Sequence, residues 1–319
     1  MVLPYNLVDK STQFVLMAKI SVIILNWNTR DLLAQCLNSI EQHKGNLQLE
    51  IIVVDNASTD GSQAMLKEKY PQIPLIANNQ NMGFAKGNNQ AMQVAHGDYF
   101  LLWNSDAFAT PGTIQSLLHL AEKEPKAAIV GAQLRNADNS FQASYTPFPN
   151  QWREFLILTG LGRTLLGHAY PSLGPEEEKG PQMVDYVEGA CLLVRRQAFQ
   201  EVGGLDEGYF MYAEEVDWCY TMAKHDWQVW YQPEAKVIHL GGASSAGRRT
   251  HREADLYRSR IRFFRKHYGS RSAQLLKIQI YTSTALKNVI HGILRRLTGG
   301  RYGRPVVSLQ HLATQLEEV

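Results

Sequence analysis

The chain has 319 residues, 45% of them hydrophobic and 19% charged, which is the composition of a globular protein with room for one large α/β domain and an appendage. A core of that size needs no disulfides, and three widely spaced cysteines exclude a disulfide framework or zinc cluster, so a reducing cytoplasm is expected. The net charge of +2 conceals an asymmetry: residues 245–304 carry 15 Lys/Arg against 2 Asp/Glu, a net of +13, which leaves −11 elsewhere.

The first 18 residues show no regular pattern and are expected to be an N-terminal extension. Asp9 and Lys10 interrupt a weakly apolar start, so no signal peptide is predicted. No uncharged apolar stretch reaches the roughly 18–20 residues that a transmembrane helix requires. The chain is therefore not expected to span a membrane.

From residue 20 onwards, short apolar runs alternate with amphipathic segments. Ile20–Leu25 is a β-branched run of the kind buried in a parallel sheet. Strands are expected at 20–25, 50–54, 73–77 and 99–103, and helices at 29–42, 62–70 and 85–95. This alternation predicts right-handed βαβ units and a doubly wound, mostly parallel sheet.

The second half is less periodic. A helix is expected at 111–122, a strand at 127–132, and a long connection with some helix at about 136–183. Strands at 186–194 and 229–238 are expected to flank a helix at about 215–225, and the chain ends in a separate basic, helical segment from 245 to 319.

Polar residues concentrate where the predicted strands end. Asn26 and Asn28 follow the first strand, Asp55 the second and Asp106 the fourth, while an Asn- and Gly-rich loop opens the third helix. Each of these is explained equally well by turn chemistry. Because open α/β sheets bind ligands at the carboxyl ends of their strands, four such clusters together predict a ligand site.

These residues resemble the successive signatures of family 2 glycosyltransferases, and most closely those of the bacterial rhamnosyltransferase-like branch. The resemblance covers about residues 19–268. Its motifs are VIILNWN (22–28), VVDNASTDG (53–61), NMGFAKGNN (81–89), LLWNSD (101–106), EGACLLVRR (188–196), GGLDEGYF (203–210), YAEEVDWC (212–219) and VIHLGGAS (237–244).

The resemblance implies an A-type nucleotide-diphospho-sugar transferase fold, with a glycosyltransferase domain at 19–244 whose nucleotide-sugar half ends near 135. It implies an inverting enzyme that moves a sugar from a nucleoside diphosphate to an acceptor hydroxyl. The branch points to dTDP-rhamnose as donor and to a saccharide or lipid-linked acceptor in cell-envelope synthesis.

A donor site is expected at the first strand ends. A carboxylate at Asp55 can accept the N3–H of uracil or thymine, a role that the resemblance implies, whereas Ser58 or Asp60 suits a helix cap better. Glycines at 83 and 87 let backbone amides approach the donor beside a helix N-terminus that favours phosphate. The candidate donor-binding residues are Asn26, Asn28, Asp55, Ser58, Asn81, Gly83, Phe84, Lys86, Gly87, Asn88, Asn104, Ser105 and Asp106.

A divalent metal, Mg²⁺ or Mn²⁺, offsets the charge of a diphosphate leaving group. Asp106 is the main candidate ligand. The family's acid-x-acid motif has Asn104 in its first position here, and His239 resembles the family's additional ligand.

The acceptor hydroxyl requires a base. Glu214, Glu215 and Asp217 offer three carboxylates, and the resemblance assigns the base to Glu215, where the family usually has Asp. Glu214 or Asp217 remains an alternative, as does a solvated acidic helix start. Candidate acceptor-binding residues are Glu188, Gly189, Ala190 and Trp218.

The basic tail interleaves cations with aromatic residues at 258–268. Beyond it, Leu286, Ile290, Ile293 and Leu297 fall on one helical face. Such a helix can lie on an anionic membrane surface, which predicts a peripheral enzyme on the inner face of the plasma membrane. The alternative is packing on the domain or on a second subunit, as in a homo-oligomer. No nucleic-acid motif accompanies the charge, so no nucleic-acid partner is expected.

Two other functions compete. A sugar-1-phosphate nucleotidylyltransferase would carry a Gly-rich basic loop after the first strand, which residues 26–30 do not match. A non-catalytic sugar-binding or scaffold protein of the same fold is opposed by Glu215 and Asp106.

Overall fold

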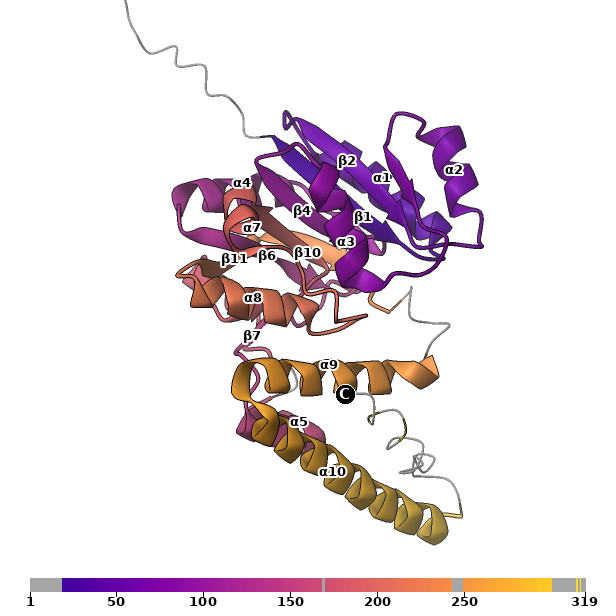
Figure 1. Cartoon of the computed structure of the whole chain (residues 1–319), viewed down its shortest axis with the longest axis vertical. Coiled ribbons are helices and arrows are strands. Elements are labelled where there is room, and N and C mark those ends of the chain that lie inside the picture. Colours follow the sequence, from indigo (N-terminus) through magenta and orange to yellow (C-terminus); the bar gives the residue numbers. More distant parts are fainter. Residues whose placement is uncertain (1–18, 168–169, 243–248, 300–313, 315, 317–319) are drawn as a thin grey trace, which may run out of the picture.

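The structure, a computed structural model, describes residues 19–167, 170–242, 249–299, 314 and 316 (Figure 1). The expected extension at 1–18 lies outside these residues. The first hundred residues form four parallel strands with helices between them, as the alternation predicts. These are β1 (Ile20–Asn26), α1 (Arg30–His43), β2 (Leu49–Asp55), α2 (Ser62–Lys69), β3 (Leu75–Ala77), α3 (Gly83–Val94) and β4 (Tyr99–Asn104). β1 lies between β2 and β4, and β3 pairs with β2.

The second half extends this sheet with strands of both directions. These are β5 (Ala107–Ala109), β6 (Ala127–Arg135), β8 (Gln182–Val184), β10 (Cys191–Arg195) and β11 (Gln228–His239). The order is β3-β2-β1-β4-β10-β6-β11-β5, with β8 also paired to β11. β10 is antiparallel to both β4 and β6, whereas β11 is parallel to β6. The expected mostly parallel sheet is therefore confirmed, with antiparallel strands added in its second half.

The single strand expected at 186–194 is wrong. Its first part, β9 (Tyr186–Val187), pairs with β7 (Tyr145–Thr146) in a separate two-stranded sheet, and only its last part, β10, enters the main sheet. β9 lies against the face of the main sheet, since a Cβ on Gly131 of β6 would come within 2.4 Å of Val187. Both parts are apolar and buried, so the run of apolar residues does not reveal the break.

Both faces of the sheet are covered by helices, which explains the continuous apolar strands. Ile20, Val22 and Ile24 of β1 pack with the buried side of α1, α2 and α4 (Thr113–Lys123), whereas Ile23 faces the opposite core. That core contains α3, α7 (Arg196–Val202) and α8 (Glu214–Lys224). Successive side chains of a strand point to opposite faces, so both cores draw on the same strands.

The basic C-terminal segment begins with a helix that belongs to the domain core. It comprises α9 (Arg249–Tyr268) and α10 (Ser270–Leu297). Ile261, Phe263 and Phe264 of α9 are almost completely buried and join the core that contains Val187 and Trp218. α10 packs on α9 and on α5 (Gln151–Thr159), which α6 (Leu161–Leu166) follows (Figure 1). Packing therefore joins α9 to the preceding domain rather than leaving it separate.

Candidate active site

The carboxyl end of β4 opens into a cleft of about 550 Å³. Most of the predicted catalytic, metal and acceptor residues meet there, although they come from four separate segments of the chain. The lining includes Phe84, Asn104, Asp106, Glu188, Gly189, Ala190, Glu214, Glu215 and His239, together with Gln142, Arg163 and Tyr212.

Strand register brings Asp106 and His239 together. β5, which local pattern did not predict, pairs antiparallel with β11 so that His239 faces Ala107, the residue after Asp106. The His239 Nε2 atom lies 3.3 Å from Asp106 Oδ1 and 3.4 Å from Asn104 Nδ2. Two residues 133 positions apart in sequence thus share one side of the cleft.

Gln142 determines which nitrogen of His239 faces the cleft. Its side-chain Nε2 donates to Asn136 Oδ1 (3.0 Å) and to the His239 carbonyl (3.3 Å), so its Oε1 is the acceptor turned to His239 Nδ1 at 2.6 Å. The neutral ring therefore carries its proton on Nδ1, and the Nε2 lone pair faces Asp106. Two acceptor atoms that face each other favour a cation between them.

This donor set fits a divalent ion that is held mainly by its substrate. Neighbouring ligands of an octahedral ion with bonds of about 2.1 Å lie about 3.0 Å apart, close to the observed Asp106–His239 separation. Within the described residues no group of three or more His, Cys, Asp or Glu side chains could hold a metal. Mg²⁺ is usually bound by one or two protein ligands together with substrate phosphates, so Asp106 and His239 suffice when a diphosphate is present.

We predict that Gln142→Leu weakens metal binding in the presence of a nucleoside diphosphate by about 10- to 100-fold, because the ring of His239 loses the acceptor that orients it. Titration of Mn²⁺ followed by electron paramagnetic resonance measures this affinity. Gln142→Glu keeps an acceptor oxygen and serves as the matched control. Equal Mn²⁺ affinity in Gln142→Leu and wild type would contradict this role.

Glu214 and Glu215 begin α8 after a strained turn. Tyr212 and Ala213 both have left-handed backbone angles (φ 73° and 63°), which cost non-glycine residues about 1–3 kcal/mol each. The turn places Glu214 in the wall of the cleft, where the residue is only 4% exposed. Its Oε2 atom has no hydrogen-bond partner among the described residues. Glu215 is only half-buried and is accessible from the cleft.

Burial shifts the acidities of three neighbouring carboxyl groups. It raises the pKa of Glu215 to about 7. Burial and then the charge of Glu215 raise the pKa of Glu188 to about 8, and the same two causes raise the pKa of Glu214 well above its usual value. Near pH 7, therefore, Glu215 exchanges a proton with solvent while Glu188 is mostly neutral, and the environment of Glu214 favours its neutral form.

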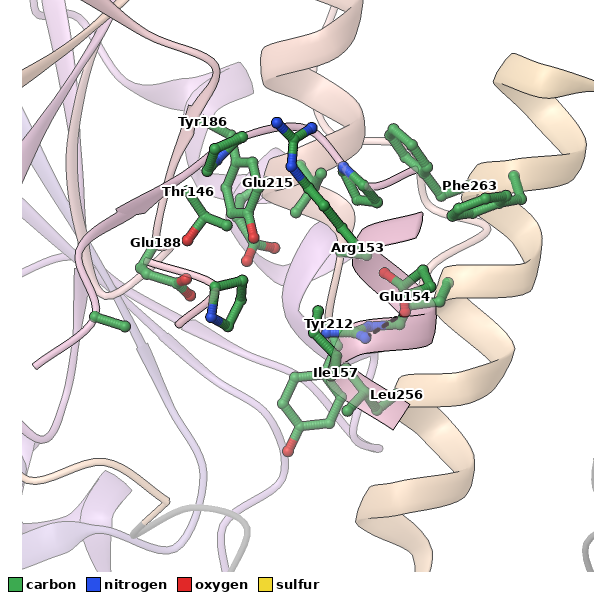
Figure 2. Close-up of a pocket in the computed structure, with 18 of the residues that line it drawn as sticks. Thr146, Arg153, Glu154, Ile157, Tyr186, Glu188, Tyr212, Glu215, Leu256 and Phe263 are labelled. Carbon is green, nitrogen blue, oxygen red and sulfur yellow. Dashed lines mark hydrogen bonds and ion pairs between the residues drawn. The ribbon is translucent and has the colours of Figure 1, made fainter. Parts of the chain in front are cut away.

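Glu215 also borders a second cavity of about 410 Å³, on the side of the cleft nearest α9 (Figure 2). Glu188, Tyr212, Ala143 and Arg163 line both cavities as well. Glu215 therefore stands in the wall between two spaces, either of which can hold a ligand.

Two predicted site residues lie elsewhere. The Asp217 carboxylate faces α9, where it accepts hydrogen bonds from Lys266 Nζ (2.7 Å), His267 Nε2 (2.7 Å) and the Tyr209 hydroxyl (3.1 Å). It lines neither cavity, and its hydrogen bonds to α9 favour a structural role over that of an alternative base. Trp218 is 2% exposed and donates to the Gly203 carbonyl from the core, so it does not contact an acceptor. Helical rotation turns both away from the face that presents Glu215.

We predict that Asp217→Asn lowers the free energy of unfolding by about 2–4 kcal/mol, because a buried acceptor of three hydrogen bonds, one of them from the ammonium of Lys266, loses its charge. Urea denaturation followed by circular dichroism measures the loss. Asp226→Asn, in an exposed turn, is the control. A large fall in kcat without loss of stability would instead restore Asp217 as a catalytic group.

The predicted nucleotide-binding residues at the ends of β1 and β2 form hydrogen bonds with one another. Asp55 is fully buried and accepts from Asn26 Nδ2 (2.8 Å), the Ser58 backbone N–H (2.9 Å) and Gln63 Nε2 (2.7 Å). Ser58 Oγ in turn accepts from the Asn28 N–H at 2.9 Å. Asp55 therefore organises this loop, and contact with a base requires a side-chain rearrangement such as the release of Gln63.

Local structure also accounts for the positions of three other polar residues near these strand ends. Asn28 lines a different hollow of about 290 Å³, and Ser105 is buried against Thr29. Asp60 accepts from the Ser62 N–H at the start of α2, which is the capping role expected of it.

At the start of α3, close packing accounts for both glycines. Gly83 has φ 81°, and a Cβ there would lie 2.4 Å from the Phe210 carbonyl oxygen, to which Phe84 N–H donates. Asn81 Oδ1 accepts from the Gly83 N–H at 2.9 Å. At Gly87 a Cβ would lie 2.4 Å from the Leu25 side chain, so close packing of helix against strand accounts for this glycine without donor contact.

Two further α3 candidates lie outside the cleft. The Asn88 side chain is buried and donates to the Phe84 carbonyl within the helix, so its observed contacts are structural. Lys86 is half-buried and does not line the cleft.

Sequence reasoning missed Gln142, Arg163 and Tyr212. Gln142 and Arg163 lie in the long connection, where no motif or periodicity distinguishes them from surface residues. Tyr212 begins the motif at 212–219, but the resemblance assigns it no role. Only the fold brings these three side chains to the cleft.

Comparison with known proteins agrees with this geometry. The family model described as "Glycosyl transferase family 2" matches residues 21–203. The chain is 32% identical over 222 residues to the N-acetylglucosaminyl-diphospho-decaprenol L-rhamnosyltransferase of Mycobacterium tuberculosis, covering 63% of this chain and 69% of that protein. It is 26% identical over 218 residues to rhamnosyltransferase WbbL of Escherichia coli, covering 65% and 76%.

Solved structures show the same fold. The mannosyltransferase of Pyrobaculum calidifontis in complex with GDP-Man and Mn²⁺ superposes with a TM-score of 0.55 at 15% identity, over 96% of this chain and 82% of that one. GalNAc-T7 with UDP, GalNAc and Mn²⁺ gives the same score and identity over 70% and 43%. In the described residues no helix is long and apolar enough to cross a membrane. The chain belongs to glycosyl transferase family 2, in which it is a rhamnosyltransferase-like glycosyltransferase.

Proposed function

We propose that the protein is an inverting glycosyltransferase that moves rhamnose from dTDP-rhamnose to a hydroxyl of a lipid-linked saccharide acceptor in cell-envelope synthesis. The observation that carries this proposal is the position of Glu215 between two cavities, with a pKa near 7. The cleft beside Asp106 and His239 suits the donor, and the second cavity suits the acceptor. Support for rhamnose and for a lipid-linked acceptor comes from the functions of the two relatives named above.

In the proposed reaction, the acceptor oxygen attacks the anomeric carbon from the side of Glu215. Its proton passes to the Glu215 carboxylate as the new C–O bond forms, and the bond to the nucleoside diphosphate breaks on the opposite face. One such displacement inverts the anomeric centre. A divalent ion at Asp106 and His239 would offset the charge of the departing diphosphate. Glu188, with its pKa raised to about 8, is mostly neutral near pH 7 and adds no second negative charge beside the base.

Turnover with a panel of nucleotide sugars tests the proposal. Purified protein is incubated with Mg²⁺ or Mn²⁺, an alkyl-diphosphate-linked N-acetylglucosamine and each donor in turn, and released nucleoside diphosphate and glycosylated product are both measured. We expect product with dTDP-rhamnose. Donor binding without turnover of any donor would favour a non-catalytic sugar-binding protein, whereas nucleotide-sugar formation from a sugar 1-phosphate would favour a nucleotidylyltransferase.

Activity should rise with pH through about 7. The base acts in its deprotonated form, so log kcat/KM is expected to increase with unit slope below about pH 7 and to level off above it. Glu188→Gln mimics the neutral form of Glu188 and should leave this rise in place. A flat profile between about pH 5.5 and 8.5 with rate-limiting chemistry would contradict a base with this pKa.

We also propose that the end of α10 binds an anionic membrane surface. Leu286, Ile290 and Ile293 are 57%, 47% and 51% exposed, and Lys287, Arg295 and Arg296 lie near them in sequence. Such a helix face gains both apolar burial and charge attraction at a lipid surface.

Co-sedimentation with phosphatidylglycerol vesicles checks this. Ile290→Glu/Ile293→Glu should reduce the bound fraction at least about 10-fold, because buried apolar area is replaced by like charge. Val94→Glu, which alters an equally exposed apolar residue (53%) on α3, should not. Equal binding of both variants would contradict the proposal, and a concentration-dependent mass that the double variant abolishes would favour a homo-oligomer instead.

A further inference from the structure

The second cavity is lined by three arginines and by the carboxyl groups of Glu154, Glu188 and Glu215, but within the described structure only one of the arginines is in an ion pair. Its cations are Arg153 on α5, Arg163 on α6 and Arg260 on α9. Arg260 is neutralised, since its Nη1 lies 2.6 Å from the Oε2 of the buried Glu154. No ion pair neutralises Arg153 or Arg163 within the described part of the chain. Two unneutralised guanidinium groups in one cavity indicate an anionic ligand.

The two arginines are arranged for a ligand that also reaches the base. Arg153 is held by a hydrogen bond from its Nη1 to the Phe148 carbonyl (2.8 Å), which leaves other N–H groups of the guanidinium for a ligand. It extends over the cavity from the helix that also supplies Glu154, and Glu188 lies on the opposite side (Figure 2). Arg163 lines both this cavity and the donor cleft. An anion between the arginines would therefore be in the same cavity as the Glu215 carboxylate.

The elements that carry these arginines also carry exposed apolar side chains. Trp152, the residue before Arg153, is 65% exposed, and Leu165 and Leu166 of α6 are 70% and 61% exposed. Apolar side chains on a short pair of helices beside a cationic cavity suit a ligand with a polar, anionic part and a hydrocarbon part. A sugar joined to a lipid through phosphate has this chemistry.

We propose that Arg153 and Arg163 bind the diphosphate of a lipid-linked acceptor, so that the sugar hydroxyl meets Glu215 while the lipid leaves along α5 and α6. This rests on the proposed function and adds the chemical group by which the acceptor is recognised. Each arginine contributes charge-assisted hydrogen bonds to phosphate oxygens, and the loss of either is expected to weaken acceptor binding by about 10- to 100-fold.

Binding provides a test that does not depend on turnover. The donor cleft is first filled with dTDP and Mg²⁺, and N-acetylglucosamine linked to an undecyl diphosphate is titrated calorimetrically against the phosphate-free undecyl glycoside. Wild type should bind the diphosphate compound at least about 10-fold more tightly. Arg153→Ala/Arg163→Ala should lose this preference, Arg153→Lys should retain part of it, and Arg271→Ala, an exposed arginine of α10 outside both cavities, should retain all of it.

Kinetics separate this inference from the proposed function. The double variant should raise the acceptor KM at least about 10-fold with dTDP affinity unchanged. Weaker dTDP binding with the acceptor preference intact would assign Arg163 to the donor diphosphate and overturn the inference. Equal wild-type affinity for the two acceptor compounds would also overturn it, whether or not the enzyme turns over. Transfer to the phosphate-free glycoside alone would still support glycosyl transfer.

Discussion

Replacement of Glu215 by glutamine is expected to lower kcat by about 10²- to 10⁴-fold, the usual contribution of a positioned general base. Glutamine keeps the size of the side chain but cannot take the acceptor proton. The affinity for dTDP should stay within a few fold of wild type, because the base is not needed to hold the leaving group. Steady-state kinetics and calorimetry measure the two quantities.

Glu214→Gln is the matched control, because the two residues are adjacent at the start of α8. Burial and the charge of Glu215 raise the pKa of Glu214 well above its usual value, which favours the neutral form that glutamine resembles. Its kcat should fall far less than that of Glu215→Gln. Equal rates in wild type and Glu215→Gln, or the larger loss in Glu214→Gln, would contradict the assignment of the base.

Asp106→Asn should abolish the metal dependence of nucleotide binding and lower kcat/KM by at least about 10²-fold, since an ion that offsets the diphosphate charge stabilises the transition state by several kcal/mol. The neutral amide keeps the shape of the side chain but not the charge that attracts a hard cation. Calorimetric titration of dTDP with and without Mn²⁺ measures the coupling between metal and nucleotide.

His239→Ala should weaken the same coupling to a smaller extent, because Asp106 remains. Asp138→Asn, in an exposed turn, should leave it unchanged. Retention of full Mn²⁺-dependent dTDP binding in Asp106→Asn would mean that the metal ligands lie elsewhere.

The alternation of strands and helices was predictable because it depends on local periodicity. The helices 29–42, 62–70 and 85–95 all form, with ends shifted by no more than about two residues. Glu188 and Gly189 lie at the break between β9 and β10, but the apolar residues on either side did not show that their strands belong to different sheets, because Val187 and Leu192 are buried in the same core. Burial favours apolar residues in both environments, so composition does not distinguish them.

The candidate site likewise combines features that local sequence predicts with features that depend on tertiary packing. Ordered motifs at strand and helix ends indicated Asp106, His239 and Glu215 without contact information. The motif around Glu215 offered three acids, however, and a helix turns successive residues by about 100°. Whether each acid faces the cleft, the core or α9 depends on what packs around α8. In the fold, the Asp217 carboxylate accepts hydrogen bonds from Lys266 and His267 of α9.

The sequence by itself therefore determined the family, the doubly wound sheet and the segments that carry the chemistry, because these depend on local pattern and residue type. Only the tertiary structure decided which side chains meet. The register of β11 on β5 joins Asp106 to His239, Gln142 orients that histidine from a segment without a motif, and α5, α6 and α9 enclose the cavity behind Glu215. The physical reason is that these contacts join segments far apart in sequence, and no periodicity within one segment encodes its distance to another.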